Sequence, residues 1–337
     1  MTKKRKTFLD ILRVSAALAV ALYHVLTGAV NMDPAVSELT VTVVNGLSRA
    51  LLWHVPTFLL ITGFLWLSDE KECTYSRVLP GIRRFVLVLF TVGLMYAMLE
   101  RFFRYRYFSL ELFGWSVADV LIGNLWDHMW YVYAVIGIYL VLPVLKPFFQ
   151  HSSIKSIAAL TGILFVFTIV LQNVEKSIGY VFPVSFPMAN PAYPAFYICA
   201  GGLISKLTLP KRTPWVAAPV FCLSMTGCFL LMVFAPAWTL WTNLFSCISA
   251  ISLFLAVKVL AENAPERPWL RCVSECSFGI YLFHQLFINV LLKLLNWYPL
   301  RRYAALSVPG AFAVVVLAAF VVTFLLRKIR WVRKYIL

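Results

Sequence analysis

The sequence has few charged residues, and it lacks the cysteine and histidine patterns that form disulfide frameworks or zinc sites. Only 13% of its 337 residues are charged, while 61% are hydrophobic; an average soluble domain carries about 25% charged residues. The seven cysteines form no C-x-x-C pair and no Cys/His pattern with the spacing of a zinc site. We therefore expect free thiols and no metal. These shortages exclude a disordered chain and a disulfide-rich secreted module, and they favour a polytopic membrane protein over a soluble enzyme.

Acidic residues are also scarce, and the positive excess has two explanations. The chain carries 30 Lys and Arg against 14 Asp and Glu, a net charge of +16. Nucleic-acid binding is one explanation of such an excess. The other is the enrichment of Lys and Arg in the cytoplasmic connectors of membrane proteins.

Long apolar runs are abundant, and they predict an all-α membrane bundle of about ten transmembrane helices. We expect one integral membrane domain over residues 1–337, because no linker is long enough to separate a second domain and no internal repeat is visible. The predicted spans cover residues 8–30, 48–67, 82–102, 128–149, 154–172, 192–207, 214–235, 239–259, 276–296 and 303–327.

The first apolar run has an alternative interpretation as a signal peptide, because Lys3-Lys4-Arg5-Lys6 precedes it. Asp10 and Arg13 interrupt the run, however, and no small-x-small cleavage site follows it. Its length matches the roughly 20 residues that cross a bilayer. We interpret it as a retained first transmembrane helix.

The basic residues distribute unequally between alternate connectors. The connectors on the N-terminal side hold 21 Lys and Arg, those on the other side hold 8, and Arg13 lies within the first helix. This asymmetry predicts that both termini are cytoplasmic. It also accounts for much of the net charge without a nucleic-acid partner.

Three ionisable residues in the first helix are candidates for function, because charge within a membrane is costly. Arg13 and His24 are eleven residues apart, about three helical turns, so they share one face and lie about 16 Å apart along the axis. Asp10 lies one turn before Arg13 and is placed to pair with it. The alternative is structural: Asp10 and Arg13 as an interfacial pair, and His24 as a core histidine bonded to a neighbour.

Five short motifs, in order, resemble the acyltransferase-3 family of integral membrane acyltransferases. That family carries an Arg, ten residues and a His in its first helix. The matching segments here are Phe8–Arg13 with Tyr23-His24, Val55–Phe58 with Ile61–Phe64, Gly81–Phe85, His128–Tyr131 with Tyr139–Pro143, and Ser277–His284. Each motif alone is weak, but five in the same order are specific.

The resemblance implies transfer of an acyl group, often acetyl from acetyl-CoA, to a hydroxyl of an envelope glycan or lipid-linked sugar. It implies a protein of the inner (plasma) membrane whose partners are membrane lipids and that acceptor, with no nucleic acid and no metal. An alcohol attacks a thioester well only if its proton is removed, and a neutral histidine suits that task. We expect His24 to be the general base, with Arg13 and Asp10 beside it. A covalent acyl-His route is the alternative.

The donor site is expected at the cytoplasmic side. Arg83 and Arg84, with Arg13, form a candidate basic mouth for the CoA phosphates. Thr62, where the family usually carries Ser, completes the predicted donor set. Adjacent arginines depart from the Arg-x-x-Arg of some members, and the alternative role of Arg83 and Arg84 is ordinary cytoplasmic anchoring.

The acceptor site is expected at the outer ends of the helices. His128 and Trp130 are candidates for binding a sugar ring, although membrane interfaces collect Trp and Tyr in any case. His284 is a further candidate, with a hydrogen bond inside the bundle as its alternative role. In the connector between Glu100 and Asp127, three arginines accompany several aromatic residues. They indicate an acidic acceptor or paired lipid head groups, and the alternative is a solvated surface.

Two other function classes compete with the enzyme. A transporter or flippase of a sugar, lipid-linked or small envelope substrate also needs ionisable residues and broken helices within the membrane. A membrane anchor or sensor is the third class. The clustering of polar residues on one helix face, with a basic cytoplasmic mouth, favours the acyltransferase. The sequence predicts neither the acceptor's identity nor the oligomeric state.

Overall fold

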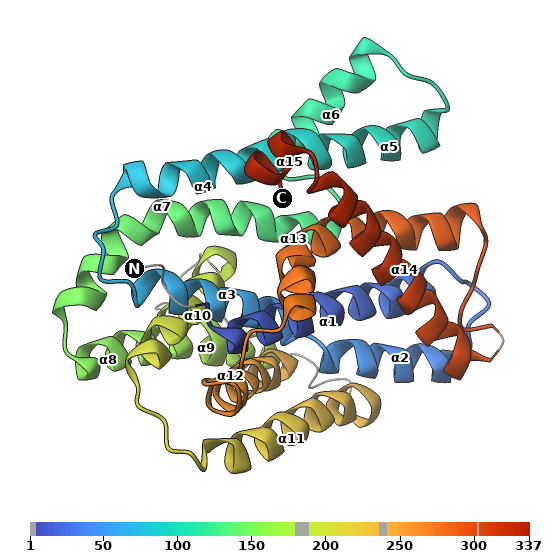
Figure 1. Ribbon diagram of the computed structural model, residues 1–337. Helices are drawn as coiled ribbons and strands as arrows, with labels where there is room; N and C mark the ends of the chain where they lie inside the picture. The colour runs from blue at the N-terminus through green and yellow to red at the C-terminus, as the bar shows by residue number, and fades with distance from the viewer. Residues whose placement is uncertain (1–4, 179–188, 236–240, 302) are drawn as a thin grey trace. The chain divides into compact units, whose positions relative to one another are not determined.

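The structure is a computed structural model, and it describes residues 5–178, 189–235, 241–301 and 303–337 (Figure 1). All regular elements in these ranges are helices. The predicted all-α polytopic bundle is therefore confirmed, and the chain is a multi-pass membrane protein.

Nine helical segments within the described residues are long and apolar enough to cross a membrane. They match nine of the ten predicted spans. Four are single helices, four contain a short π-helical or 3₁₀ segment, and one consists of two consecutive helices. Their elements are α1 (Thr7–Asn31), α2 (Glu38–Ala50) with α3 (His54–Leu67), α4 (Tyr75–Val88) with η1 (Leu89–Gly93) and α5 (Leu94–Tyr105), η2 (Asp127–Met129) with α7 (Trp130–His151), α8 (Ile154–Phe165) with η3 (Val166–Val170) and α9 (Leu171–Ile178), α11 (Thr213–Phe234), α12 (Thr242–Leu260), α13 (Pro268–Asn289) with η5 (Val290–Leu294), and α14 (Ala304–Leu326).

The remaining predicted span, 192–207, coincides with α10 (Ala189–Lys206). Its residues from Phe196 to Ala200 are all buried. Glycines bring α10 and α3 into direct backbone contact: a Cβ atom at Gly63 would collide with the carbonyl of Ile198, and one at Gly201 with that of Leu60. Such close approach is typical of helices that pack inside membranes.

The pairing of α1 with α13 indicates that α10 crosses the membrane. Asp10 of α1 contacts Ser274 of α13, and fourteen residues later His24 contacts His284, so the two helices run parallel. An odd number of crossings must therefore separate them. Six of the long apolar segments lie between α1 and α13. An odd number of crossings therefore requires one more, and α10 supplies it. With α10, the described part of the chain contains ten crossing segments, the number predicted from the sequence.

The helices group into two compact units. The first comprises residues 1–68 and 152–324 and contains α1 and α13; the second comprises residues 69–151 and 325–337. In the first unit, Phe8, Phe64 and Phe254 join α1, α3 and α12 through ring contacts of 5.5–6.1 Å. Val25 packs in a further apolar cluster with residues of α13, η5 and α14. Helix α1 is thus packed against other helices of the first unit near both of its ends.

The second unit contains two helices that lie outside the predicted spans. Helix α6 (Leu110–Ile122) lies within the predicted connector between Glu100 and Asp127, and α15 (Arg330–Tyr335) follows α14. Ser109 caps α6, its Oγ accepting a hydrogen bond from the backbone N–H of Leu112 at 3.1 Å. Tyr133 of α7 donates to the carbonyl of Val120 at 2.5 Å, which fixes α6 against its own unit.

Candidate active site

Helix α1 carries the three residues that the sequence analysis placed at the active site, and its regular course from Thr7 to Asn31 preserves their spacing. Between Arg13 and His24, Ala17, Val20 and Ala21 are almost completely buried. These small side chains let α13 pack closely along α1. Polar groups from α13 meet α1 at two levels, one at its N-terminal end and one about four turns later.

At the first level, the buried carboxylate of Asp10 collects hydrogen bonds from two arginines and a serine. Arg5 donates through Nε and Nη2 at 2.7 and 2.8 Å, Ser274 of α13 donates through Oγ at 2.7 Å, and Arg13 donates through Nη1 at 3.3 Å. The bidentate Arg5 pair is the stronger arrangement. Asp10 does pair with Arg13, but its closest ionic partner is Arg5.

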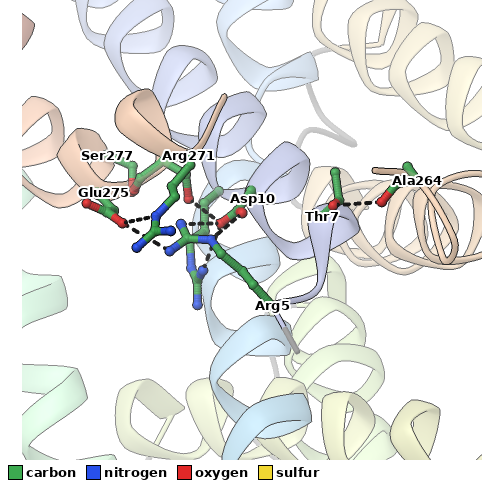
Figure 2. Close-up of polar contacts among 9 residues, drawn as sticks. Arg5, Thr7, Asp10, Ala264, Arg271, Glu275 and Ser277 are labelled. Carbon is green, nitrogen blue, oxygen red and sulfur yellow. Dashed lines mark hydrogen bonds and ion pairs between the residues drawn. The ribbon is translucent and has the colours of Figure 1, made fainter. Parts of the chain in front are cut away.

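A second carboxylate extends this network along α13 (Figure 2). Glu275 accepts from Arg5 Nη1 at 3.1 Å and from Arg271 Nε at 2.9 Å. Arg5 therefore bridges the carboxylates of Asp10 and Glu275, and the neighbouring carboxylates raise its pKa above the ordinary value. Nearby, Thr7 donates to the carbonyl of Ala264 at 2.9 Å. The network ties the start of α1 to the segment that leads into α13.

At the second level, three histidines and a tyrosine meet inside the first unit. The ring of His24 lies 5.1 Å from that of His284 and 4.9 Å from that of Tyr23, and Tyr23 lies 5.3 Å from His54. His284 and His54 are buried, whereas His24 is half-buried. We call these four residues the histidine cluster.

The contacts of His284 favour one tautomer. Its Nδ1 lies 2.7 Å from the carbonyl oxygen of Tyr281 and 3.2 Å from that of Ile280. A carbonyl accepts only, so Nδ1 carries the proton in this arrangement and Nε2 carries the lone pair. The backbone of α13 thereby fixes the ring beside His24.

His54 is the member of the cluster that the sequence analysis left unassigned. It is 5% exposed, and within the described residues neither ring nitrogen has a hydrogen-bond partner. A buried polar group of this kind costs about 1–3 kcal/mol. Its position at the start of α3, directly before the Val55–Phe58 motif, was the available signal, but only the packing of α3 beside α1 brings it to Tyr23.

The predicted donor residues lie in separate units. In the second unit, Arg84 donates from Nε to the carbonyl of Ile336 at 3.2 Å, and the exposed Arg83 lies 5.4 Å from the ring centre of Tyr335. Both arginines thus contact the segment around α15. In the first unit, Thr62 donates its hydroxyl to the carbonyl of Phe58 at 2.9 Å, a bond within its own helix.

The predicted acceptor residues are also divided. His284 belongs to the histidine cluster of the first unit. In the second unit, His128 is buried behind aromatic rings, 5.6 Å from Tyr96 and 6.5 Å from Trp126. Trp130 is 46% exposed and faces away from the packed core of that unit. His128 therefore supports neighbouring rings, and Trp130 presents an accessible surface.

Metal-ligand geometry is not found in the ranges that the structure describes: no group of three or more His, Cys, Asp or Glu is arranged to hold an ion. The three histidines of the cluster meet through ring contacts instead. The first unit therefore contains two adjacent imidazoles, those of His24 and His284, within a transmembrane bundle. The helix that carries His24 is anchored by the buried carboxylate of Asp10.

Comparison with known proteins gives one match. A family model described as an acyltransferase domain, that of acyltransferase-3, matches residues 6–328. Neither the curated proteins nor the solved structures contain a significant match.

Proposed function

The chain belongs to the acyltransferase-3 family. We propose that it transfers an acetyl group from cytoplasmic acetyl-CoA to a hydroxyl of a cell-envelope glycan or lipid-linked sugar. The observation that supports this proposal best is the histidine cluster. It sets His24, on a helix within the membrane, 5.1 Å from the ring of His284. The proposed location is the inner (plasma) membrane.

In the proposed reaction, His24 takes the proton of the acceptor hydroxyl as its oxygen attacks the thioester carbonyl carbon. The new C–O bond forms, the C–S bond breaks, and CoA leaves as a thiolate that takes up a proton. A histidine suits this role because its ordinary pKa of about 6.5 lies close to neutral pH. The neutral form of the imidazole is the one that accepts a proton.

The other residues of the first unit are proposed to hold His24 in place. Asp10 and Arg13 fix the N-terminal end of α1, and the bond from Ser274 to Asp10 sets the register of α1 against α13. His284, whose ring is fixed by backbone carbonyls, limits the orientations open to His24. Catalysis is sensitive to such positioning, since a displacement of about 1 Å in a reacting group lowers rates by roughly a hundredfold.

Donor and acceptor contacts follow the predicted topology. For the donor, we propose that Arg83 and Arg84 of the second unit bind phosphates of CoA at the cytoplasmic side. We propose Arg13 and Thr62 of the first unit as further contacts of the donor. We propose His128, Trp130 and His284 for the acceptor side. The arginines have the chemistry for this task, since guanidinium groups bind phosphate in bidentate fashion.

Substitution of His24 tests the proposal. Purified His24→Ala protein should transfer acetyl about 10²- to 10⁴-fold more slowly than the wild type, the usual contribution of a general base, while its Tm and its affinity for CoA are unchanged. His151→Ala is the matched control, because His151 is exposed at the end of α7. Acetyl transfer at the wild-type rate by His24→Ala would show that His24 is not the base.

The covalent alternative has its own readout. Incubation with acetyl-CoA in the absence of acceptor, followed by mass spectrometry of the peptide that contains His24, should show no acetyl group if His24 acts as a base. An acetylated His24 would establish the acyl-His route instead.

A further inference from the structure

A cavity in the second unit combines aromatic rings with paired charges. Its volume is about 490 Å³, within the range of small-molecule sites. It lies between α5, α6 and the segment that leads into α7, entirely within residues 97–126. The third span runs away from the N-terminal side, so the end of α5 and this cavity lie on the predicted outer side.

The aromatic residues of the cavity present accessible ring surfaces. Tyr105, Tyr107 and Trp115 are 48%, 56% and 57% exposed. A fourth ring, Trp126, is held in place by stacking on Tyr96 at 4.2 Å. Flat apolar faces beside polar groups suit the pyranose ring of a sugar, which has apolar C–H faces and a rim of hydroxyls.

The polar residues of the cavity are largely fixed by one another. Asp119 pairs with Arg101 and accepts from the amide of Asn124 at 3.0 Å, and Glu100 accepts from Trp126 Nε1 at 3.3 Å. Each carboxylate has further lone pairs that accept hydroxyl protons. Such a preformed set of donors and acceptors lowers the ordering cost of binding a polyhydroxyl ligand.

The charge of the lining favours an uncharged ligand. Three carboxylates, from Glu100, Glu111 and Asp119, face two guanidinium groups, from Arg101 and Arg104. An acidic sugar or a phosphate would meet an excess of negative charge. An acidic acceptor was one interpretation of the arginines in this connector, but in the structure Asp119 pairs with Arg101.

An apolar compartment adjoins the polar one. A second cavity of about 300 Å³ shares Arg101, Tyr107 and Leu112 with the first, and its other lining is mainly apolar, including Phe102 and Phe113. A neutral glycosyl group would occupy the polar compartment, and an apolar chain attached to it would fit the second.

We propose that the polar cavity between α5 and α6 is a binding site for a neutral glycosyl group, and that it holds the acceptor of acyl transfer. The second clause rests on the proposed function; the binding site itself does not.

Photo-crosslinking in the intact membrane tests the site even when the acceptor has not been identified. Trp115 is replaced by p-benzoyl-phenylalanine in the full chain, the cells are irradiated, and the purified adducts are analysed by mass spectrometry. The control places the same group at Phe90 of η1, which is 40% exposed and lies outside the cavity lining. We expect neutral hexose or N-acetylhexosamine units at position 115 and none at position 90.

The nature of the adduct decides the outcome. An attached isoprenoid chain identifies a lipid-linked sugar and its absence a polysaccharide segment; either supports the site. Acidic sugars at position 115, phospholipid at both positions, or no sugar at position 115 would overturn the proposal.

Kinetics separate this site from the proposed chemistry. In Trp115→Ala, the KM for the acceptor should rise about tenfold, the scale of one lost aromatic contact, while kcat and the KM for acetyl-CoA hold. An unchanged KM for the acceptor would show that the cavity does not bind the acceptor of acyl transfer. A sugar adduct on a protein that transfers no acetyl group would leave the binding site standing and refute the proposed function.

Discussion

At the start of α1, the buried carboxylate of Asp10 accepts hydrogen bonds from Arg5, Arg13 and Ser274. Four turns later, the ring of His24 lies against that of His284, and Tyr23 lies against His54. Both levels join α1 to α13. At the first, both carboxylates of the network have charged hydrogen-bond donors. At the second, His54 is buried with both ring nitrogens unpaired within the described residues.

From this difference we propose that the first level serves stability and the second serves chemistry. A satisfied network holds its geometry and offers little capacity to accept a proton. A buried imidazole without hydrogen-bond partners lowers the free energy of unfolding. Proteins retain such destabilising groups mainly at functional sites. The prediction is that substitutions at the first level mainly destabilise the fold, while those at the second mainly lower activity.

The largest effect is expected from Asp10→Asn. This substitution removes the buried carboxylate that Arg5 and Arg13 share, which should lower the free energy of unfolding by about 3 kcal/mol, as for other broken buried pairs. Thermal unfolding in lipid nanodiscs measures the change. Arg271→Ala is the control: its ion pair with Glu275 is 58% exposed on the arginine side, so that Tm should barely move. Equal effects of the two variants would contradict the assignment of Asp10 as the centre of the network.

An intermediate effect, with opposite signs for stability and activity, is expected from His54→Phe. Phenylalanine replaces two unpaired buried nitrogens by carbon at similar volume, so Tm should rise. If His54 supports Tyr23 and His24, kcat should fall by roughly tenfold to a hundredfold, with the KM for acetyl-CoA unchanged. If the variant is more stable and fully active, His54 only fills space in the core. The proposed contrast between a stabilising first level and a catalytic second level would then be weaker.

The smallest effect concerns a third polar contact of the first unit, just beyond the end of α1. Arg301 donates to both carboxylate oxygens of Asp33 at 2.9–3.1 Å, and these bonds hold the pKa of Asp33 below its ordinary value of 3.8. A carboxyl with a lowered folded-state pKa contributes stability that is present above about pH 4 and is lost as the pH falls further.

Asp33→Asn should therefore lower Tm slightly at pH 7, and its Tm should approach that of the wild type as the pH falls toward 3. Glu38→Gln is the control, because Glu38 is exposed at the start of α2. A gap between Asp33→Asn and the wild type that stays constant down to pH 3 would show that the pair makes no pH-dependent contribution.

Much of the fold was predictable because the local hydrophobicity of the sequence identifies membrane spans. A run of about 20 apolar residues must form a helix in lipid, where every backbone polar group needs an internal partner. The predicted ends differ from the observed ones by a few residues in most spans, although α13 begins at Pro268, eight residues before the predicted start. Helix α6 was missed because its sequence gives a short helix that lies outside any span.

The candidate site was predictable only in part. Asp10, Arg13 and His24 share a helix, so their relation follows from helical geometry. The roles of Arg5, Ser274 and His54 depend on contacts with distant segments, such as the 264 residues that separate Asp10 from Ser274. No local pattern encodes those contacts.

By itself, the sequence determined the all-α bundle, the count of crossings and the polar face of α1, because hydrophobicity and helical periodicity act over a few turns. Tertiary structure decided the rest. It paired α1 with α13 in parallel, brought His24, His54 and His284 into one cluster with Tyr23, and paired Arg101 with Asp119. These outcomes depend on which helices pack together, and packing is set by the shape of whole surfaces: the glycine contacts between α3 and α10 and the small residues along α1 fix those neighbours.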